Sequence, residues 1–409
     1  MVHMNYTWLG GLRVIESSAY IAAPLAGMTL AQFGADVIRI DPIGGGLDYG
    51  RLPRMPHGRS LYWTGLNKGK RSIAVDLRRP EGRELVQALA TSAGDSAGVL
   101  LSNVMSSWLA HAVLAARRSD VITCTISGNA DGSTAVDYTV NCATGYPAIT
   151  GGGSVEAPVN NVVPAWDMAC AHQAAFALLA ALEHRRRTGR GSELRLALSD
   201  VAFTALSHLG SLAEAELLQQ DRPSIGNYVY GAFGRDFGTA DGRRIMVAGI
   251  SSGQWQALIK ACDAQTAMEE LQARLGLAFE READRYEARE AIARVIAAWC
   301  AARPLAEIAR VFDAHRVCWG LYRSVRDLLA NDPRVSEASE VFESIETAGV
   351  GRHRAAGTPV RSAGEARGAT RPAPLLGQHT DEVLHEVLGL DASAVGRLHD
   401  AGIVAGAEL

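Results

Sequence analysis

The sequence predicts an α/β fold: a large domain built on a doubly wound parallel sheet (Rossmann-like), with a smaller α+β domain. Three observations lead to this prediction. Short apolar strand patterns alternate with longer helical patterns through the first third of the chain. A chain of 409 residues is too long for one compact core, so two domains, or one domain with an insertion, are expected. From about residue 221 onward, aromatic and glycine-rich segments indicate short antiparallel strands.

The elements of the first third follow one another as strand, helix, strand. Strands of five to seven residues joined by helices of about ten residues imply right-handed βαβ units and a parallel sheet. The strands are expected at 12–16, 36–40, 71–77, 98–102 and 121–127, and the helices at 23–33, 80–90 and 107–118. Later, 168–187 predicts an alanine-rich buried helix, and 193–200 predicts a further strand.

Composition shifts set the expected domain boundaries. Residues 1–221 are assigned to the large domain, and 222–325 to the small domain, which contains a hairpin at the Asp241-Gly242 turn and two helices. In 326–409, an extended Gly/Ala/Arg/Pro-rich connector leads to a closing pair of helices that is expected to return to the large domain.

Composition and short motifs exclude several classes of function. The net charge of -4 gives no electrostatic footprint for nucleic acid, and no signal peptide or long apolar run predicts membrane association, so a cytoplasmic location is expected. The six cysteines stand singly, which favours neither disulfides nor a metal site. The first strand–helix turn, "ESSAYIAAP", lacks the glycines of a dinucleotide site.

The stretch "VVPAWDMACAHQ" carries one acidic residue, Asp167, at the start of the buried helix. Judged locally, an aspartate in this position is most simply a helix cap, which satisfies free backbone N–H groups. The same position also suits a nucleophile, because the helix dipole favours the ionised carboxylate. The local sequence leaves both interpretations open.

Four segments in order along the chain resemble the family III CoA-transferases, the CaiB/BaiF family, which also contains 2-methylacyl-CoA racemases. They are "LRVIESSAYIAAPLAGMTLAQFGADVIRID", "NKGKRSIAVDLRRPEGREL", "PAWDMACAHQAAFALLAALEHRRRTGRGSELRLALSD" and "PLLGQHTDEVLHEVLGL". The resemblance implies an acyl-CoA substrate, no permanently bound cofactor apart from the CoA of the substrate, and an interlocked homodimer.

The resemblance places the catalytic nucleophile at Asp167. A carboxylate nucleophile suits CoA transfer, because an acyl anhydride on the enzyme keeps the energy of the thioester for the return step. Asp137 and Tyr138 are expected to orient the substrate or Asp167. Racemases of this family carry a proton-transferring histidine where Val136 stands here, and formyl-CoA-type transferases carry a glutamine where Ile21 stands.

The remaining site residues are expected to hold CoA and the acyl group. By resemblance, the cofactor contacts are Tyr20, Ile21, Ala22, Asn67, Lys70, Arg71 and Asn103. If the substrate is a dicarboxylate, burying its free carboxylate requires a cation. The substrate contacts are therefore expected at Arg51 and Arg235, together with Tyr230 and Gly231 of a glycine loop in the small domain.

The segments "DPIGGGLDYGR", "VDYTVN", "NNVVPAWD" and "GNYVYGAFGRDF" narrow the resemblance to members that move CoA between the two carboxyl groups of one branched, unsaturated C5 dicarboxylate. Three alternatives stay open at this point. They are an intermolecular CoA-transferase with a separate acid as acceptor, an acyl-CoA racemase, and a non-catalytic acyl-CoA-binding protein.

Overall fold

The protein is described by a computed structural model in which residues 5–407 are defined. The chain forms two compact units. The first contains residues 1–144, 161–213 and 333–409, and the second contains residues 145–160 and 214–332. The predicted boundaries place residues 145–160 in the large domain, whereas in the structure this segment belongs to the second unit.

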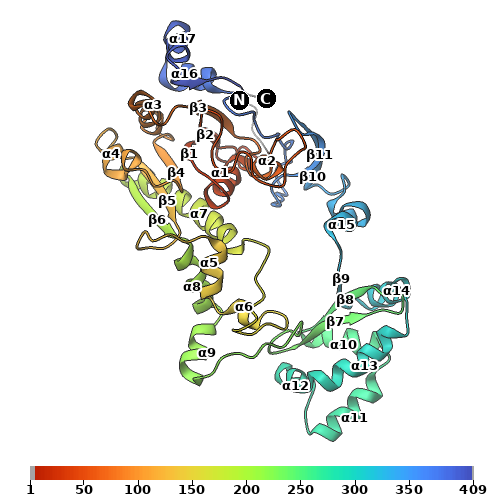
Figure 1. Ribbon diagram of the computed structural model, residues 1–409. Coiled ribbons are helices and arrows are strands. Elements are labelled where there is room, and N and C mark those ends of the chain that lie inside the picture. Colours follow the sequence, from red (N-terminus) through yellow and green to blue (C-terminus); the bar gives the residue numbers. More distant parts are fainter. Residues whose placement is uncertain (1–4, 408–409) are drawn as a thin grey trace. The chain divides into compact units, whose positions relative to one another are not determined.

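The first unit is built on a seven-stranded sheet in the order β12-β3-β2-β1-β4-β5-β6 (Figure 1). All neighbouring strands pair in parallel except β12, which lies antiparallel to β3 at the edge. The parallel sheet of the prediction is thus confirmed, with one unforeseen edge strand. The strands are β1 (Arg13–Ser17), β2 (Asp36–Pro42), β3 (Arg71–Val75), β4 (Val99–Ser102), β5 (Ile122–Ser127), β6 (Ser192–Ala197) and β12 (Val404–Ala405).

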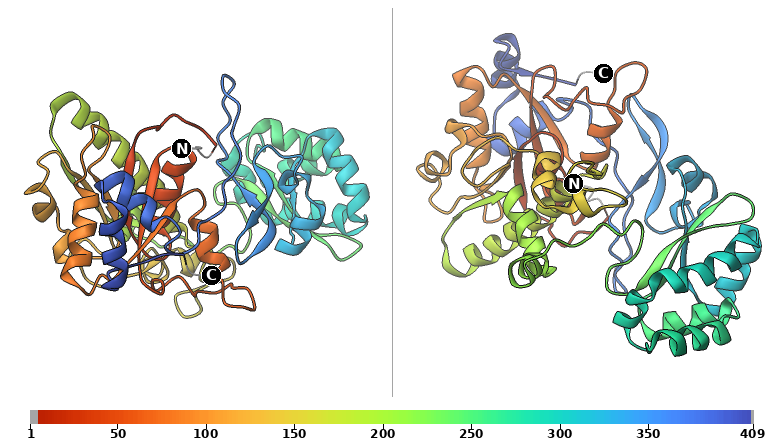
Figure 2. Two further views of the ribbon diagram at one scale, coloured as in Figure 1. Left: turned by 90° about the horizontal axis from the view of Figure 1, so that it is seen from above. Right: turned by 60° about the horizontal axis from the view of Figure 1, so that its bottom comes forward.

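Helices cover both faces of this sheet. One face packs against α1 (Ala22–Gln32), α7 (Ala165–Thr188) and α8 (Leu198–His208). The other packs against α3 (Pro80–Ala90), α16 (Thr380–Leu388) and α17 (Ala392–Asp400), and the C-terminal helices lie beside α3 in Figures 1 and 2. The shorter elements of this unit are α2 (Leu61–Leu66), η1 (Ser107–Leu109), α4 (His111–Ala115), α5 (Asp137–Ala143), η2 (Pro333–Val335), β10 (Phe342–Thr347) and β11 (Gly351–Ala356).

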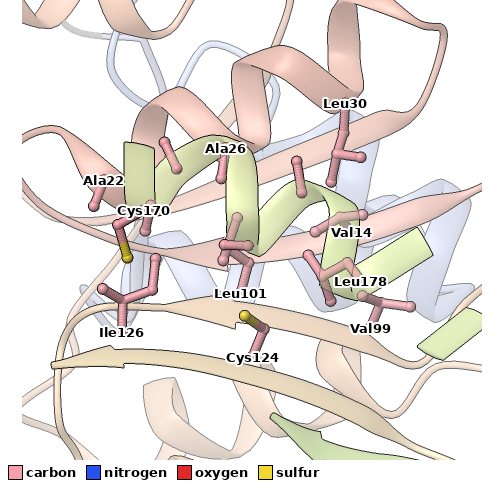
Figure 3. Close-up of a cluster of buried hydrophobic side chains, with 14 of the residues drawn as sticks. Val14, Ala22, Ala26, Leu30, Val99, Leu101, Cys124, Ile126, Cys170 and Leu178 are labelled. Atoms are coloured by element: carbon pink, nitrogen blue, oxygen red, sulfur yellow. The ribbon is translucent and has the colours of Figure 1, made fainter. Parts of the chain in front are cut away.

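Helix α7 is held in the core through small side chains. Cys170, Ala171 and Ala174 are fully buried against Ala22 and Ala26 of α1, because residues without long side chains let the two helices approach closely (Figure 3). Among the described residues, α7 is the one helix long and apolar enough to cross a membrane. One side of it packs into this core, and 33% of its apolar window is buried.

The second unit contains a three-stranded antiparallel sheet in the order β7-β8-β9 with its own hydrophobic core. Its strands are β7 (Phe233–Gly238), β8 (Arg244–Gly249) and β9 (Cys318–Leu321), so the predicted hairpin at Asp241-Gly242 joins β7 to β8. Its helices are α6 (Tyr146–Ile149), α10 (Ser252–Ala261), α11 (Gln265–Leu275), α12 (Glu282–Glu287), α13 (Arg289–Ala301), α14 (Leu305–His315) and α15 (Val325–Asn331). Helix α9 (Ser211–Leu218) crosses the division between the units.

Candidate active site

Asp167 is the third residue of α7 and lies in its first turn. The residue that precedes the helix, Pro164, supplies no side-chain cap. The cap comes from elsewhere in the chain: Oδ2 of Asp137 accepts hydrogen bonds from the backbone N–H groups of Trp166 (2.7 Å) and Asp167 (3.0 Å). The capping role that the local sequence offered to Asp167 is therefore filled by Asp137.

The start of α5 fixes the start of α7. Asp137, the first residue of α5, is 3% exposed, and Asn141 one turn later accepts a hydrogen bond from the indole N–H of Trp166 (3.0 Å). Two side chains from one short helix thus hold successive positions of α7. The carboxylate of Asp167 is left free of the capping role, on a backbone that cannot shift easily.

The environment of Asp167 makes its carboxyl group harder to ionise. Burial first, and the charge of Asp137 second, raise the pKa of Asp167 from an ordinary 3.8 to about 7. This is opposite to the direction expected from the helix dipole alone. The two N–H groups that carry much of that dipole are bonded to Asp137. A carboxyl group with a pKa near neutrality is a better nucleophile than an ordinary one and is still substantially ionised at pH 7.

Tyr62, in the first turn of α2, shares an electrostatic environment with Asp167. Burial, the largest cause, raises the pKa of the Tyr62 phenol to about 12. Four further groups influence the pKa of this phenol: Arg51 lowers it, and Asp167, Asp48 and Tyr138 raise it. The expected residues Arg51 and Tyr138 thus share an electrostatic environment with Tyr62 and the candidate nucleophile. Tyr62 itself was not predicted, although it lies shortly before the family-like segment "NKGKRSIAVDLRRPEGREL".

Arg51 is exposed, and its guanidinium group lies between two tyrosine rings. It is 5.4 Å from the ring centre of Tyr20 and 5.2 Å from that of Tyr62, within the range of cation–π attraction. Tyr138 is 40% exposed and Val136, its neighbour two positions earlier, is 52% exposed, so both present side chains to solvent in this unit.

The turn between β1 and α1 is held by polar side chains from other segments. Tyr20 has a left-handed backbone (φ 62°), and its N–H donates to Asp48 (3.0 Å). The amide of Asn103 bonds both the N–H (2.8 Å) and the C=O (2.7 Å) of Ala19. Asn103 therefore shapes this turn rather than offering a free amide. Ala22 is buried inside α1, whereas Tyr20 is 40% exposed.

Asn67, Lys70 and Arg71, which are expected to contact CoA, are bonded to other groups of the first unit. The ammonium group of Lys70 donates to Glu16, to the Pro24 carbonyl and to Asn67, each at 2.8 Å. Asn67 is completely buried, and burial lowers the pKa of Lys70 to about 8. Arg71 is bonded to three carboxylates, those of Asp36, Glu382 and Glu386. These groups have the partners that buried charges require.

Lys70 belongs to a larger buried ionic network. Arg39 is 0% exposed and pairs with Asp41 (2.9 Å) and Asp48 (3.2 Å), and it lies 3.6 Å from Glu16. Because Asp48 also accepts a hydrogen bond from the N–H of Tyr20, this network holds the β1–α1 turn in place. Lys70 and the buried network to which it belongs thus support the site indirectly, by fixing the position of Tyr20.

A cavity of about 620 Å³ lies in the first unit over β4, β5 and β6. Its strand residues Thr125 and Arg195 alternate with Cys124 and Leu194, which face α7, so the cavity is on the opposite face of the sheet. Further lining comes from the segment after Asn103, including Ser106 and His111. Among the residues that the structure describes, no cluster of histidine, cysteine, aspartate and glutamate side chains could hold a metal ion.

Three expected substrate contacts, Tyr230, Gly231 and Arg235, belong to the second unit. Arg235 donates to the Tyr228 hydroxyl (2.7 Å) and its guanidinium carbon lies 4.6 Å from the Tyr228 ring centre, so it is engaged within its own unit. The hydroxyl of Tyr230 donates to Glu214 (2.6 Å), and Gly231 has a positive φ of 77° in the turn before β7.

An α/β domain with an aspartate in the first turn of its central helix can present a carboxylate nucleophile from a rigid element. The sequence matches the model of CoA-transferase family III over residues 9–380, and the chain belongs to this family. It is 50% identical over 400 residues to 2-methylfumaryl-CoA isomerase of Chloroflexus aurantiacus, covering 97% of this chain and 98% of that protein.

More distant relatives share the family and the fold. Human succinyl-CoA:glutarate CoA-transferase is 26% identical over 413 residues, covering 98% of this chain and 90% of that protein. A CaiB/BaiF family protein of Brucella suis, known from its crystal structure, superposes with a TM-score of 0.75 at 23% identity and covers 94% of this chain and 100% of that one. The chain is therefore an enzyme of a family that acts on CoA esters.

Proposed function

We propose that the protein moves CoA between the C1 and C4 carboxyl groups of 2-methylfumaryl-CoA (mesaconyl-CoA) or a similar dicarboxylic acyl-CoA. The observation that carries this proposal is the 50% identity with 2-methylfumaryl-CoA isomerase over nearly the whole length of both chains. The local structure supports it, because the guanidinium carbon of Arg51 lies 5.2 Å from the ring centre of Tyr62 and the charge of Asp167 acts on the same phenol.

Asp167 is the proposed acyl carrier. Its carboxylate oxygen attacks the thioester carbonyl, the C–S bond breaks, and a mixed anhydride and CoA thiolate form. The thiolate attacks the Asp167 carbonyl, which gives an aspartyl-CoA thioester and the free dicarboxylate. After the acid turns around, its other carboxylate attacks the aspartyl thioester and expels the thiolate. That thiolate then attacks the substrate carbonyl and restores the carboxylate of Asp167.

The test is incubation with the C1 thioester, followed by chromatography of the C4 isomer. Asp167→Asn should abolish isomerisation, and hydroxylamine should modify Asp167 of the wild type during turnover. Asp381→Asn is a matched control, because Asp381 also lies in the first turn of a helix but pairs with His399 on the surface. Turnover by Asp167→Asn at the wild-type rate would contradict the covalent mechanism.

We place the nucleotide end of CoA in the cavity over β4, β5 and β6. Its lining continues from Asn103, whose bonds to Ala19 connect this region to the turn that carries Tyr20. His111 and Arg195 are the basic groups of the lining, which also contains Asp131, Glu193 and Asp200, and Arg195 pairs with Glu193 (2.6 Å). Replacing each by alanine should raise KM for the acyl-CoA but not for the corresponding acyl-pantetheine, which lacks the nucleotide. Equal effects on both substrates would rule out this placement.

Two other reactions remain as alternatives for the same fold. An intermolecular transferase, like the relative named for succinyl-CoA and glutarate, would incorporate labelled free mesaconate into the product. A racemase would exchange deuterium at C2 of a 2-methylacyl-CoA, and Val136 offers no proton-carrying group for this step. The intramolecular proposal requires little incorporation of free acid and no exchange.

We also propose that the protein is a homodimer. Besides the family resemblance, exposed apolar side chains on α7 and α8 support this: Phe176 is 68% exposed, Phe203 is 40% exposed, and Leu209 beyond α8 is 70% exposed. Such a group of apolar side chains is typical of a surface that another chain covers. Light scattering of the purified protein tests this, and a monomer at micromolar concentration would contradict it.

A further inference from the structure

The backbone around Arg51 is fixed on both sides of the residue. Its N–H donates to the carbonyl of Asp48 (3.2 Å), and its own carbonyl accepts from the hydroxyl of Ser60 (2.6 Å). Ser60 is 2% exposed and also caps α2, which carries Tyr62. One serine thus connects the backbone of Arg51 to the helix whose tyrosine its side chain contacts.

The guanidinium group of Arg51 forms no ion pair with a carboxylate in residues 5–407. Asp48, three positions earlier, is buried and committed to Arg39 and to the amide of Tyr20. The rings of Tyr20 and Tyr62 flank Arg51 instead, which limits the orientations of its planar fork without neutralising its charge. An exposed arginine held in this way is prepared to bind an anion from solution.

Arg51 and Asp167 are connected through a common neighbour. The guanidinium carbon of Arg51 lies 5.2 Å from the ring centre of Tyr62, and the charge of Asp167, from another part of the first unit, acts on the hydroxyl group of the same residue. A ligand placed at this tyrosine can therefore meet a carboxylate nucleophile at one end and a cation at the other. This arrangement matches a short molecule that has two carboxyl groups.

We propose that Arg51, held between Tyr20 and Tyr62, binds the free carboxylate of a dicarboxylic acyl-CoA while the other carboxyl group reacts at Asp167. The inference rests on the proposed function and specifies its substrate class. The fork of an arginine matches the two oxygens of a carboxylate, whereas a lysine offers a single point of charge. When the acid turns around, its two carboxyl groups exchange ends, so the same arginine serves both half-reactions.

This role makes Arg51 a determinant of specificity. A monocarboxylic acyl-CoA leaves the guanidinium group without a partner and gains nothing from it. A hydrogen-bonded charge pair contributes enough to change affinity by about 10- to 100-fold. The wild type should therefore prefer dicarboxylic over monocarboxylic acyl-CoA esters by this factor, and removing the guanidinium group should abolish the preference.

The experiment compares two acyl groups of nearly equal shape. In (E)-2-methylbut-2-enoyl-CoA, a methyl group replaces the second carboxylate of 2-methylfumaryl-CoA. Arg51→Gln should lower kcat/KM for adduct formation at Asp167 with the dicarboxylic ester by about 10- to 100-fold, and should leave the monocarboxylic ester unchanged. Arg51→Lys should lie between. Arg54→Gln is the matched control. Arg54 is exposed in the same loop, and its replacement by glutamine removes the same charge.

The outcomes separate the two proposals. If the wild type does not isomerise the dicarboxylic ester, the proposed function is wrong. The affinity of both esters for Asp167→Asn, where no acyl transfer occurs, then still tests the arginine. If Arg51→Gln behaves as Arg54→Gln, or if it lowers kcat/KM for both esters equally, the proposed role of Arg51 as a carboxylate-binding residue is wrong. Selective loss of the dicarboxylic ester supports it.

Discussion

Replacing Asp137 by asparagine is expected to lower the pKa of Asp167 while keeping the cap on α7. The amide oxygen of asparagine can still accept from the N–H groups of Trp166 and Asp167, which lie 2.7 and 3.0 Å from the carboxylate oxygen of Asp137. The negative charge, however, is removed. Since that charge is one of the two causes that raise the pKa of Asp167, the carboxyl group should ionise at lower pH.

The size of the effect follows from the pKa of about 7 for Asp167. Only the ionised form is nucleophilic, and it makes up about 10% of the protein at pH 6 and about 90% at pH 8. Burial, the larger cause, remains in the variant, so only part of the rise is lost. A fall of one unit corresponds to about 1.4 kcal/mol and would bring the ionised fraction at pH 6 to about 50%.

The assay is the pH dependence of kcat/KM for isomerisation of the C1 thioester. The acid limb of the wild-type profile should fall near pH 7, and that of Asp137→Asn should move to lower pH. Asp137→Ala removes both charge and cap. Its acid limb should move likewise, with an additional loss of stability of about 1 kcal/mol. An acid limb that coincides in the wild type and in Asp137→Asn would refute the electrostatic coupling of the two aspartates.

The same pKa shift predicts the pH dependence of stability. The folded state holds the proton of Asp167 up to a pKa of about 7, whereas the unfolded chain releases it near 3.8. The folded state therefore binds more protons in this window, and the contribution of Asp167 to stability decreases as pH rises from about 4 to 7. Urea unfolding should show a smaller decrease for Asp137→Asn than for the wild type. An equal decrease in both proteins would contradict the assignment.

Three further predictions concern packing, charge and reactivity. Arg39→Met should destabilise the protein by about 3–5 kcal/mol in urea unfolding, because it leaves buried carboxylates without their main cation, and a loss below about 1 kcal/mol would contradict this. Gly27→Ala should lower Tm, since its Cβ would lie 1.8 Å from a buried Glu16 oxygen, whereas Gly65→Ala has nothing within 4 Å and serves as the control. Maleimide should label only the two exposed cysteines of the folded protein, Cys142 and Cys318. Rapid labelling of a third cysteine would contradict the burial of the other four.

Elements with strong local signals were predictable from the sequence. The helix 80–90 has a proline at its start and apolar residues on one face, and its observed bounds are the same. The predicted helix 107–118 breaks into η1 and α4, because Ala110 adopts an extended backbone (ψ 145°) that apolar periodicity does not reveal. Part of the connector forms the hairpin β10–β11, whose Arg- and Ala-rich second strand lacks the alternating pattern of a strand.

The features of the site were likewise predictable where the signal is local and not where it depends on distant residues. The position of Asp167 at the start of a buried helix was predictable, because helix boundaries and apolar runs are local properties. The burial of Lys70 was not, since its partner Glu16 is 54 residues away and a basic segment is normally exposed. Tyr62 was missed for a related reason: a tyrosine among apolar residues gives no sign of the charges that the fold places around it.

Two demands on one carboxylate explain why the site needs two aspartates. A helix cap must accept backbone hydrogen bonds continuously, whereas an acyl carrier must release its oxygens to form a bond to the substrate. Asp137 bonds the N–H groups at the start of α7, so Asp167 can remain on a rigid helix without being held by it. The capping charge also disfavours ionisation of its neighbour, which brings the proposed nucleophile to a pKa near neutrality. Capping and the proposed catalysis compete when only Asp167 is considered, and they support each other once Asp137 is included.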